Sequence, residues 1–482
     1  MNYSVVIYIL GWIMEIEAAF LALPGIVSAI YGEKGGFAFL WVALGSAVAG
    51  SAIILRKPKN MRFYLREGFV TVALSWILMS VIGCLPFVIN GDIPHFADAL
   101  FEMISGFTTT GATVVSDVEG LTKGSLFWRS FSHWIGGMGV LVFLLAIVPM
   151  AGGSHMNLMK AESPGPSVGK LVPKVRQTAK YLYIIYFALT MIEVIFLLFG
   201  GMNLFEALTT SFGTAGTGGF AIWNDGFVSV SPYNQWVVTI FMLLFGVNFG
   251  FYFLILTGKL RDALKFEEVR IYFIIVIAAA VFIFINLRHF ALYAPAEGIR
   301  QAFFQVASII TTTGFASADF NLWPETSRTI LVLLMFIGAC AGSTGGGIKV
   351  SRFIIACKSF IKEIISYLHP RSVKKIKIEG KPLEHETLRA TNVYFMTYMV
   401  IFAVSVLLVS IENKDLVTNF AAVAAPFNNI GPGLSLVGPM ANFGHFTDFT
   451  KYILMFDMLA GRLEIFPMML LFCPAVWKRR RA

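Results

Sequence analysis

The sequence is poor in charged residues. Aspartate, glutamate, lysine and arginine together make up 13% of its 482 residues, about half the share that is usual in a soluble domain. Hydrophobic residues make up 57%, and the mean hydropathy is +0.75. This composition excludes an ordinary soluble protein and predicts an integral membrane protein with many spans.

The sequence also lacks the usual signs of a metal site or an enzyme. Its four cysteines show no CxxC spacing, which argues against disulfides and zinc. Its seven histidines form no HExxH pair, and no GxSxG is present. We therefore expect neither an enzyme nor a covalently bound cofactor.

Long apolar runs are abundant. Many exceed the ~18 residues that cross a bilayer, and they are continuous, which favours helices over the alternating strands of a barrel. The first run has no basic leader and is too long for a signal peptide. Ten spans are predicted, at 5–31, 36–55, 68–90, 126–150, 180–200, 234–257, 269–287, 327–357 (interrupted), 390–411 and 450–476.

The positive charges give an orientation. Most of the 37 lysines and arginines fall in alternate connecting segments, at 56–67, 151–180, 258–270, 349–389 and the C-terminal tail. The positive-inside rule places these segments, and hence both termini, in the cytoplasm. The net charge of +9 then reflects topology and requires no nucleic acid, although basic loops also bind anionic membrane lipid as a general effect.

A fourfold repeat occupies the opposite segments. Four glycines, Gly111, Gly219, Gly314 and Gly431, recur about 105 residues apart, each thirteen residues after a similar triplet. The repeated stretches are "DALFEMISGFTTTGA", "EALTTSFGTAGTGGF", "QAFFQVASIITTTGF" and "TNFAAVAAPFNNIGP". The fold class is therefore an all-α polytopic membrane protein, with four span–pore-loop–span repeats around a central pore and an N-terminal two-helix hairpin.

A short helix that enters the membrane and returns as an extended segment needs a protected place. Non-helical backbone at membrane depth is tolerated only inside protein or along a water-filled cavity. Four such segments around one axis present rings of backbone carbonyls, which replace the hydration shell of a monovalent cation. Glycine permits the required backbone and removes a side chain from the path, and threonine hydroxyls add oxygen ligands suited to K⁺ or Na⁺.

The chain resembles the TrkH/TrkG/KtrB superfamily of microbial potassium transporters. The resemblance covers essentially the whole chain, and the N-terminal hairpin is closer to the TrkH/TrkG branch. Beside the four glycine segments it rests on "FWRSFSHWIGGMGVLV" (127–142), "ESPGP" (162–166), "AGSTGGGIKVSR" (341–352) and "MLAGRLEIFP" (458–467). It implies a homodimer in the bacterial cytoplasmic membrane, each subunit with its own pore, regulated by a cytosolic nucleotide-binding (TrkA-like) ring.

Carried over residue by residue, the resemblance gives a K⁺ selectivity filter. Its residues are Thr109, Thr110, Gly111, Thr217, Gly218, Gly219, Thr312, Thr313, Gly314, Asn429, Ile430 and Gly431. K⁺ is expected at Thr110, Gly111, Gly218, Gly219, Thr313, Gly314, Ile430 and Gly431. Relatives that accept sodium often carry serine at the first-repeat position, so Gly111 favours potassium. The spacing favours Gly431 over Gly433 as the fourth glycine, and the departures from "TTG" in repeats two and four suggest softer selectivity.

Two features inside spans resemble gates. Five glycines within 338–350, including Gly345, Gly346 and Gly347, are compatible with close helix packing or with a broken helix whose mobile loop obstructs the pore. The resemblance supports the loop, with Lys349 at its cytoplasmic end. Arg462 lies mid-span, where a charge is costly; it either pairs with Asp457 or Glu464 or stands in the pore beneath the filter.

Some questions stay open from the sequence. The intramembrane acids Glu15, Glu17 and Glu193 have no assigned role beyond hydrogen bonding or a proton path. Acidic residues outnumber basic ones in the outer loops, including Asp98 and Glu102, which fits a cation-attracting vestibule or an ordinary solvated surface.

The predicted function is potassium uptake through a gated pore, with a K⁺ symporter coupled to H⁺ or Na⁺ as the alternative. The predicted domains are 1–60 (hairpin), 61–160, 161–260, 261–365 (with the loop 338–350) and 366–482.

Overall fold

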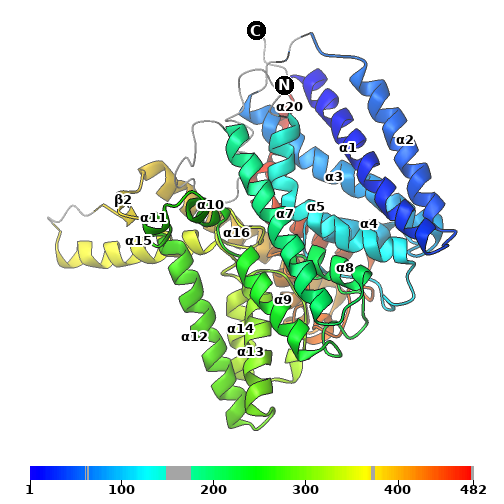
Figure 1. Ribbon diagram of the computed structural model, residues 1–482. Coiled ribbons are helices and arrows are strands. Elements are labelled where there is room, and N and C mark those ends of the chain that lie inside the picture. The colour runs from blue at the N-terminus through cyan, green and yellow to red at the C-terminus, as the bar shows by residue number, and fades with distance from the viewer. Residues whose placement is uncertain (60, 62–63, 148–174, 371–374, 479–482) are drawn as a thin grey trace.

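The computed structural model describes residues 1–59, 61, 64–147, 175–370 and 375–478. The motif "ESPGP" (162–166), most of the basic segment 151–180, the end of the predicted span 126–150 and the predicted boundary at 160–161 lie outside these residues. Figure 1 shows a bundle built almost entirely of helices, as expected.

The N-terminal hairpin consists of α1 (Tyr3–Ile30) and α2 (Gly36–Ile54). Glycines let the two helices approach closely: a Cβ on Gly36 would lie 2.4 Å from Cβ of Ser28, and a Cβ on Gly50 would lie 2.9 Å from the carbonyl oxygen of Gly11. The hairpin lies at one edge of the bundle (Figure 1), outside the four repeats.

Each repeat has a long first helix, a short helix, an irregular segment and a second helix. The first helices are α3 (Leu65–Asn90), α7 (Val175–Phe199), α12 (Glu267–His289) and α16 (His385–Val409). The short helices are α4 (Phe96–Phe107), α8 (Leu204–Gly216), α13 (Pro295–Ile310) and α17 (Leu416–Phe427). At roughly 1.5 Å per residue, none of the four short helices reaches across the ~30 Å apolar layer of a membrane.

The second helices differ from one another. They are α5 (Lys123–Ile147), α9 (Pro232–Phe245) with α10 (Phe249–Leu256), α14 (Glu325–Met335) with α15 (Val350–Leu368), and α18 (Asp448–Arg462) with α19 (Phe466–Leu471). The axes of α9 and α10 diverge by 88°. In Figure 1, α15 extends sideways away from the main body of the bundle.

Six helices are long and apolar enough to cross a membrane among the described residues, or seven if the bent pair α9–α10 counts as one span. The six are α1, α2, α3, α7, α12 and α16, which match predicted spans. The predicted spans 327–357 and 450–476 are broken, the first at 336–349 and the second at 463–465. Glu464 and Ile465 take positive φ, which an α-helix does not allow.

The repeats interlock around a common centre. The second helix of one repeat packs on the short helix of the next: α5 on α8, α9 on α13, and α18 back on α4. Polar contacts mark two of these junctions. Nε of Arg300 donates to Oε1 of Gln235 at 2.8 Å, and the ammonium of Lys451 contacts the carboxylate of Asp98.

The two ends of the described chain lie together. The N-terminal amine of Met1 donates to the carbonyl oxygen of Lys478 at 3.2 Å, close to the short helix α20 (Pro474–Trp477). The prediction that both termini are cytoplasmic requires them to share one side, and this contact satisfies that requirement.

Two small elements lie in segments that the sequence predicts to be cytoplasmic. One is the short helix α11 (Leu260–Ala263), and the other is an antiparallel pair of strands, β1 (Lys377–Ile378) and β2 (Lys381–Pro382), in which Ile378 faces Lys381. The all-α prediction did not include these strands. The residue boundaries predicted for the five domains stay a prediction.

Candidate functional site: a ring of four backbone turns

The four short helices end in the same backbone turn. The first residue beyond the helical path has a left-handed conformation at Thr109, Thr217, Thr312 and Asn429, with φ between 53° and 58°. Two residues later comes a glycine with φ between 77° and 93°, at Gly111, Gly219, Gly314 and Gly431. Left-handed φ is rare for threonine, so its recurrence at equivalent positions shows that one structure is repeated four times.

A common hydrogen bond closes each turn. The residue between the two left-handed positions donates its N–H to a carbonyl five residues earlier, as in the Schellman ending of a helix. The pairs are Thr110 to Ser105 (2.9 Å), Gly218 to Gly213 (2.8 Å), Thr313 to Ser308 (2.8 Å) and Ile430 to Ala425 (2.9 Å).

The four glycines form a closed ring, which we call the glycine ring. A Cβ on Gly111 would lie 2.0 Å from the carbonyl oxygen of Gly218 in the next repeat. The equivalent distances are 2.0 Å from Gly219 to Thr313, 1.8 Å from Gly314 to Ile430 and 2.7 Å from Gly431 to Thr110. The sequence of contacts therefore passes through all four repeats and returns to the first.

The ring surrounds an opening. All four glycines border one cavity of about 120 Å³. Gly431 takes the fourth place in the ring, as the spacing predicted, whereas Gly433 lies against Ala421 and Val437. Glycine is required at each position for two reasons. Its positive φ disfavours a side chain, and the carbonyl group of the adjacent repeat occupies the space that a Cβ would need.

The threonine side chains make the first and third repeats alike. The hydroxyls of Thr108 and Thr110 are 2.8 Å apart, and those of Thr311 and Thr313 are 2.7 Å apart. The second and fourth repeats replace these pairs by Gly216 with Gly218 and by Asn428 with Ile430. The backbone of the ring is thus fourfold, whereas only the first and third repeats share the same side chains.

The break in the third repeat is a loop of residues 336–349, which we call the glycine loop. It agrees with the loop predicted at 338–350 and begins two residues earlier. Gly338, Gly342 and Gly347 have positive φ, between 66° and 69°. Positive φ explains the glycines better than close helix packing does, because the backbone here is not helical.

The glycine loop lies directly against the left-handed turns of the glycine ring. The N–H of Gly346 donates to Oγ1 of Thr312 at 2.6 Å, and a Cβ on Gly346 would lie 2.7 Å from Cβ of Asn429. A Cβ on Gly345 would lie 3.0 Å from the carbonyl oxygen of Thr311. The loop therefore touches the left-handed residues of two repeats.

Two basic side chains bind carbonyls of the loop. Lys349 is buried, and its ammonium donates to the carbonyls of Gly345 and Gly346. The guanidinium of Arg462 donates to the carbonyl oxygens of Thr344 and Gly136, both at 2.7 Å. Arg462 thereby joins the loop to α5.

Arg462 has no acidic partner among the described residues. Glu464 binds Arg352 instead, and Asp457 accepts a hydrogen bond from Oγ of Ser405 at 2.7 Å. The interpretation of Arg462 as an arginine neutralised by Asp457 or Glu464 is therefore wrong. Its charge is held by backbone carbonyls beside the loop.

Comparison with known proteins agrees with this geometry. A family model described as TrkH, a cation transport protein, matches residues 37–479. The chain belongs to the TrkH family of cation transport proteins. It is 36% identical to the Trk system potassium uptake protein TrkH of Escherichia coli K12, over 99% of this chain and all of that protein.

Other relatives extend the comparison. The chain is 31% identical to the Trk system potassium uptake protein TrkG of the same organism, over 99% of both chains. The crystal structure of the potassium transporter TrkH from Vibrio parahaemolyticus superposes with a TM-score of 0.89 at 32% identity, covering 99% of this chain and all of that one. The predicted family and fold class are confirmed, and the chain is a membrane transport protein and not an enzyme.

Sequence reasoning missed one ion pair behind the ring. Glu102 on α4 and Arg129 on α5 are buried with nitrogen and oxygen 2.7 Å apart. Glu102 also accepts from the N–H of Val114, at 3.0 Å, in the irregular segment that follows the ring glycine Gly111. The prediction of Glu102 as an outer surface acid is therefore wrong: it supports the outgoing backbone, and only its pairing with Arg129 reveals this.

Sequence reasoning also missed Glu268, the second residue of α12. Oε1 of Glu268 accepts from the N–H of Ala341 at 2.7 Å and from the N–H of Ser351 at 2.9 Å. Ala341 lies inside the glycine loop, and Ser351 lies just beyond it. One carboxylate oxygen therefore joins the first half of the loop to the first turn of α15 (Val350–Leu368).

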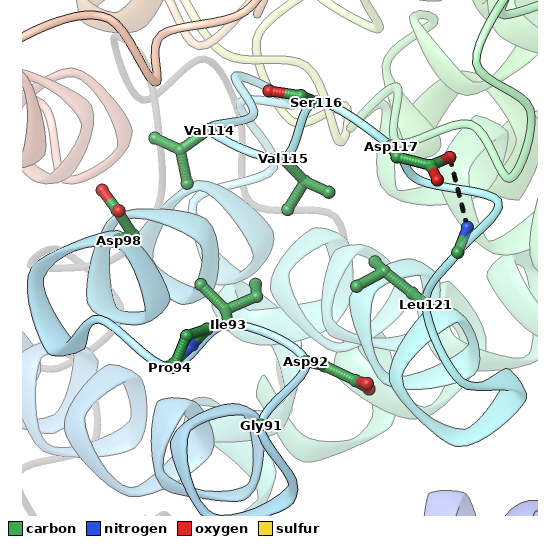
Figure 2. Close-up of a pocket in the computed structure, with 11 residues that line it drawn as sticks. Gly91, Asp92, Ile93, Pro94, Asp98, Val114, Val115, Ser116, Asp117 and Leu121 are labelled. Atoms are coloured by element: carbon green, nitrogen blue, oxygen red, sulfur yellow. Dashed lines mark hydrogen bonds between the residues drawn. The ribbon is translucent and has the colours of Figure 1, made fainter.

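A second cavity, of about 430 Å³, lies beside the ring at segments that the sequence predicts to face the outside. Figure 2 shows Asp92, Asp98 and Asp117 around it, with Val114 and Val115 along one side. Asp98 contacts Lys451, and Asp117 accepts from the N–H of Gly120 at 3.3 Å. Three carboxylates at the rim make the cavity acidic, in keeping with a negatively charged outer vestibule.

The intramembrane acids occupy different surroundings. Glu15 accepts from Oγ of Ser51 at 2.6 Å, whereas Glu17 and Glu193 are fully buried. None of the three borders the cavity at the glycine ring.

Proposed function

We propose that the chain takes up potassium across the bacterial cytoplasmic membrane through a selective, gated pore. The observation that carries the proposal is the closed glycine ring: four equivalent backbone turns, one from each repeat, surround a single opening. Membership of a cation transport family supports the proposal, as do relatives that are named potassium uptake proteins.

The physical argument concerns dehydration. A potassium ion that leaves water needs several oxygen ligands to replace its hydration shell. Four backbone turns in register offer such oxygens at low cost, because their positions are fixed by the helix endings before the ion arrives. The ion ligands we propose are at Thr110, Gly111, Gly218, Gly219, Thr313, Gly314, Ile430 and Gly431.

The gate in this proposal is the glycine loop. It rests against Thr312 and Asn429, directly beside the path that an ion must take after leaving the ring. Arg462 and Lys349 bring two positive charges to the same place, and a fixed positive charge opposes the passage of a cation. Withdrawal of the loop with Gly345, Gly346 and Gly347 would open the path.

Regulation and assembly belong to the same proposal. We propose a homodimer, a cytosolic nucleotide-binding ring as the partner that moves the loop, and cytoplasmic termini. The support is the family relationship together with the basic cytoplasmic segments, since a ring that acts on the loop must reach it from that side.

Flux measurements in liposomes test the proposal. Purified protein should take up K⁺ and Rb⁺ well above Na⁺ when driven by voltage alone, and Gly314→Ser should alter that preference. Uptake that requires an imposed H⁺ or Na⁺ gradient would favour the alternative of a symporter. If the protein alone shows no flux, the measurement is repeated with the cytosolic partner, and equal uptake of all three cations in that state would contradict a potassium filter.

A further inference from the structure

We propose that His133 is a positioning residue of the filter. Its imidazole occupies, beside Gly218 of the second repeat, the space that the side chains of Thr110 and Thr313 occupy in the first and third repeats. The proposal deepens the function proposed above and rests on it. His133 belongs to α5, the second helix of the first repeat, so it supplies to the second repeat a wall that this repeat lacks.

Gly218 is a glycine for a different steric reason from the four glycines of the ring. Gly218 does not have positive φ, so its backbone would accept a side chain. A Cβ on Gly218 would, however, lie 2.2 Å from Cγ, 2.3 Å from Nδ1 and 2.5 Å from Cδ2 of His133. The imidazole alone accounts for these closest contacts, and it therefore excludes the threonine found at Thr110 and Thr313.

The hydrogen bonds of His133 join two repeats. Nδ1 lies 2.8 Å from the carbonyl oxygen of Gly106, near the end of α4 in the first repeat. Nε2 accepts from the N–H of Phe220 at 3.2 Å, directly after the ring glycine of the second repeat. A carbonyl only accepts and an N–H only donates, so the pair of partners requires the neutral imidazole with its proton on Nδ1.

Packing fixes the orientation of the ring. His133 is fully buried, and its ring lies against that of Phe220 with centroids 4.3 Å apart. The guanidinium of Arg129 covers Phe220 at 4.2 Å, and Arg129 in turn is held by Glu102. These stacked contacts, which run from His133 through Phe220 and Arg129 to Glu102, fix the turn of the second repeat relative to α4.

The consequence is that the side chain tolerated at position 218 depends on the side chain at position 133, although the two positions belong to different repeats. Loss of the imidazole leaves the N–H of Phe220 without its partner and the turn at Thr217–Gly219 without a wall. A threonine at 218 cannot enter while the imidazole is present. Removing the imidazole should therefore make Gly218→Thr tolerable, which would convert the second repeat to the "TTG" of the first and third.

The test is a double-mutant cycle with His133→Ala, Gly218→Thr and the combined variant. Each is measured by K⁺ and Na⁺ uptake in liposomes with the partner present, and by the thermal unfolding midpoint. His289→Ala serves as a matched control, because His289 lies exposed at the outer end of α12.

We expect Gly218→Thr to lose K⁺ uptake at least tenfold and to lower the unfolding midpoint. His133→Ala should reduce the ratio of K⁺ to Na⁺ uptake severalfold while the protein remains folded. The combined variant should regain at least part of the uptake that Gly218→Thr loses, and His289→Ala should behave as the unmodified protein.

Three results would overturn the proposal. The first is a combined variant whose loss of K⁺ uptake equals the product of the losses in the two single variants. The second is a His133→Ala variant whose ratio of K⁺ to Na⁺ uptake is unchanged. The third is non-additivity of the two substitutions in the unfolding midpoint without any non-additivity in the ratio of K⁺ to Na⁺ uptake. The last would leave His133 and Gly218 as a packing pair only. If the unmodified protein shows no selective uptake, the proposed function fails, while the midpoints still decide whether the imidazole and residue 218 compete for one space.

Discussion

Two regions of the four repeats follow opposite rules, namely the glycine ring and the second helices. At the glycine ring the repeats share one backbone conformation, and the φ values of the four glycines lie between 77° and 93°. The second helices, in contrast, differ in length, in bending and in where they break. The backbone is therefore nearly fourfold at the ring and asymmetric beyond it.

The differences between the second helices are specific to each repeat. In the first, α5 runs unbroken from Lys123 to Ile147, while in the second α9 bends by 88° into α10. The third is interrupted by the glycine loop, and in the fourth α18 ends at Arg462. The bend of the second repeat holds the loop of the third, because Cys340 donates its N–H to the carbonyl oxygen of Gly246, and Phe249 donates to that of Gly342.

This contrast separates two tasks. In the function proposed above, coordination of an ion by equivalent oxygens requires four similar turns, which would account for the repeated sequence at the ring. The proposed gate needs only one moving segment and a fixed frame around it, which would account for second helices that differ from one repeat to the next. The predictions below test the separation, beginning with the ring, where we expect the largest effects.

Gly314→Ala should lower K⁺ uptake by more than tenfold and, like Gly314→Ser, alter the preference for K⁺ over Na⁺. The new Cβ would meet the carbonyl oxygen of Ile430 at 1.8 Å, and left-handed backbone costs a non-glycine residue about 1–2 kcal/mol in addition. Uptake of K⁺ in liposomes is the measurement. Gly45→Ala is the control, because Gly45 lies in α2 with no atom near the added Cβ; equal losses in both variants would contradict a special role for the ring.

Arg462→Gln should raise basal K⁺ uptake in the absence of the partner by about fivefold to tenfold. The substitution removes the charge and one of the two carbonyl contacts that join the loop to α5. Arg462→Lys keeps the charge but lacks the planar fork that reaches two carbonyls. Its basal K⁺ uptake should therefore lie between that of the unmodified protein and that of Arg462→Gln. Reduced uptake in Arg462→Gln, with normal folding, would show that the arginine does not restrain the pore.

Glu268→Ala should loosen the glycine loop and leave the ring unchanged. Cys340 is a natural reporter, because it lies in the loop and is fully buried. In a protein whose other three cysteines are replaced by serine, a small thiol reagent should modify Cys340 several times faster after Glu268→Ala, with unchanged K⁺ to Na⁺ preference. Glu267→Ala is the control, since Glu267 binds Lys358 on α15 at 2.6 Å and does not bind the loop; equal labelling rates in the two variants would argue against the clamp.

Asp98→Asn should have the smallest effect. The ion pair with Lys451 joins the fourth repeat to the first, but Asp98 is partly exposed, and such pairs contribute about 1 kcal/mol or less. The unfolding midpoint should fall slightly at low salt, and less at high salt because ions screen the pair. A large change in K⁺ to Na⁺ preference would show that the outer rim takes part in selection.

Much of the glycine ring was predictable because its signal is local and repeated. The glycine spacing placed all four members of the ring, including Gly431, since the same thirteen residues separate each triplet from its glycine and each short helix ends in the same turn. The loop was predictable because five glycines in ten residues oppose a helix by roughly 1 kcal/mol each. Their roles in conduction and gating stay predictions.

The errors concern contacts between distant residues. Asp457 and Glu464 lie near Arg462 in sequence, yet the chain turns sharply at Glu464 and Ile465 and directs Glu464 to Arg352. Glu102 looked like an outer acid because α4 lies in an outer segment, but its buried face meets Arg129 of another helix. Neither outcome can be read from neighbours along the chain.

The sequence by itself determined the membrane class, the number of repeats and the position of each glycine, because hydropathy and backbone preference are properties of short segments. Only the tertiary structure decided which carbonyl faces which glycine, which acid clamps the loop and why position 218 has no side chain. These outcomes depend on atoms from repeats about a hundred residues apart competing for the same few ångströms, and close packing permits one arrangement of them.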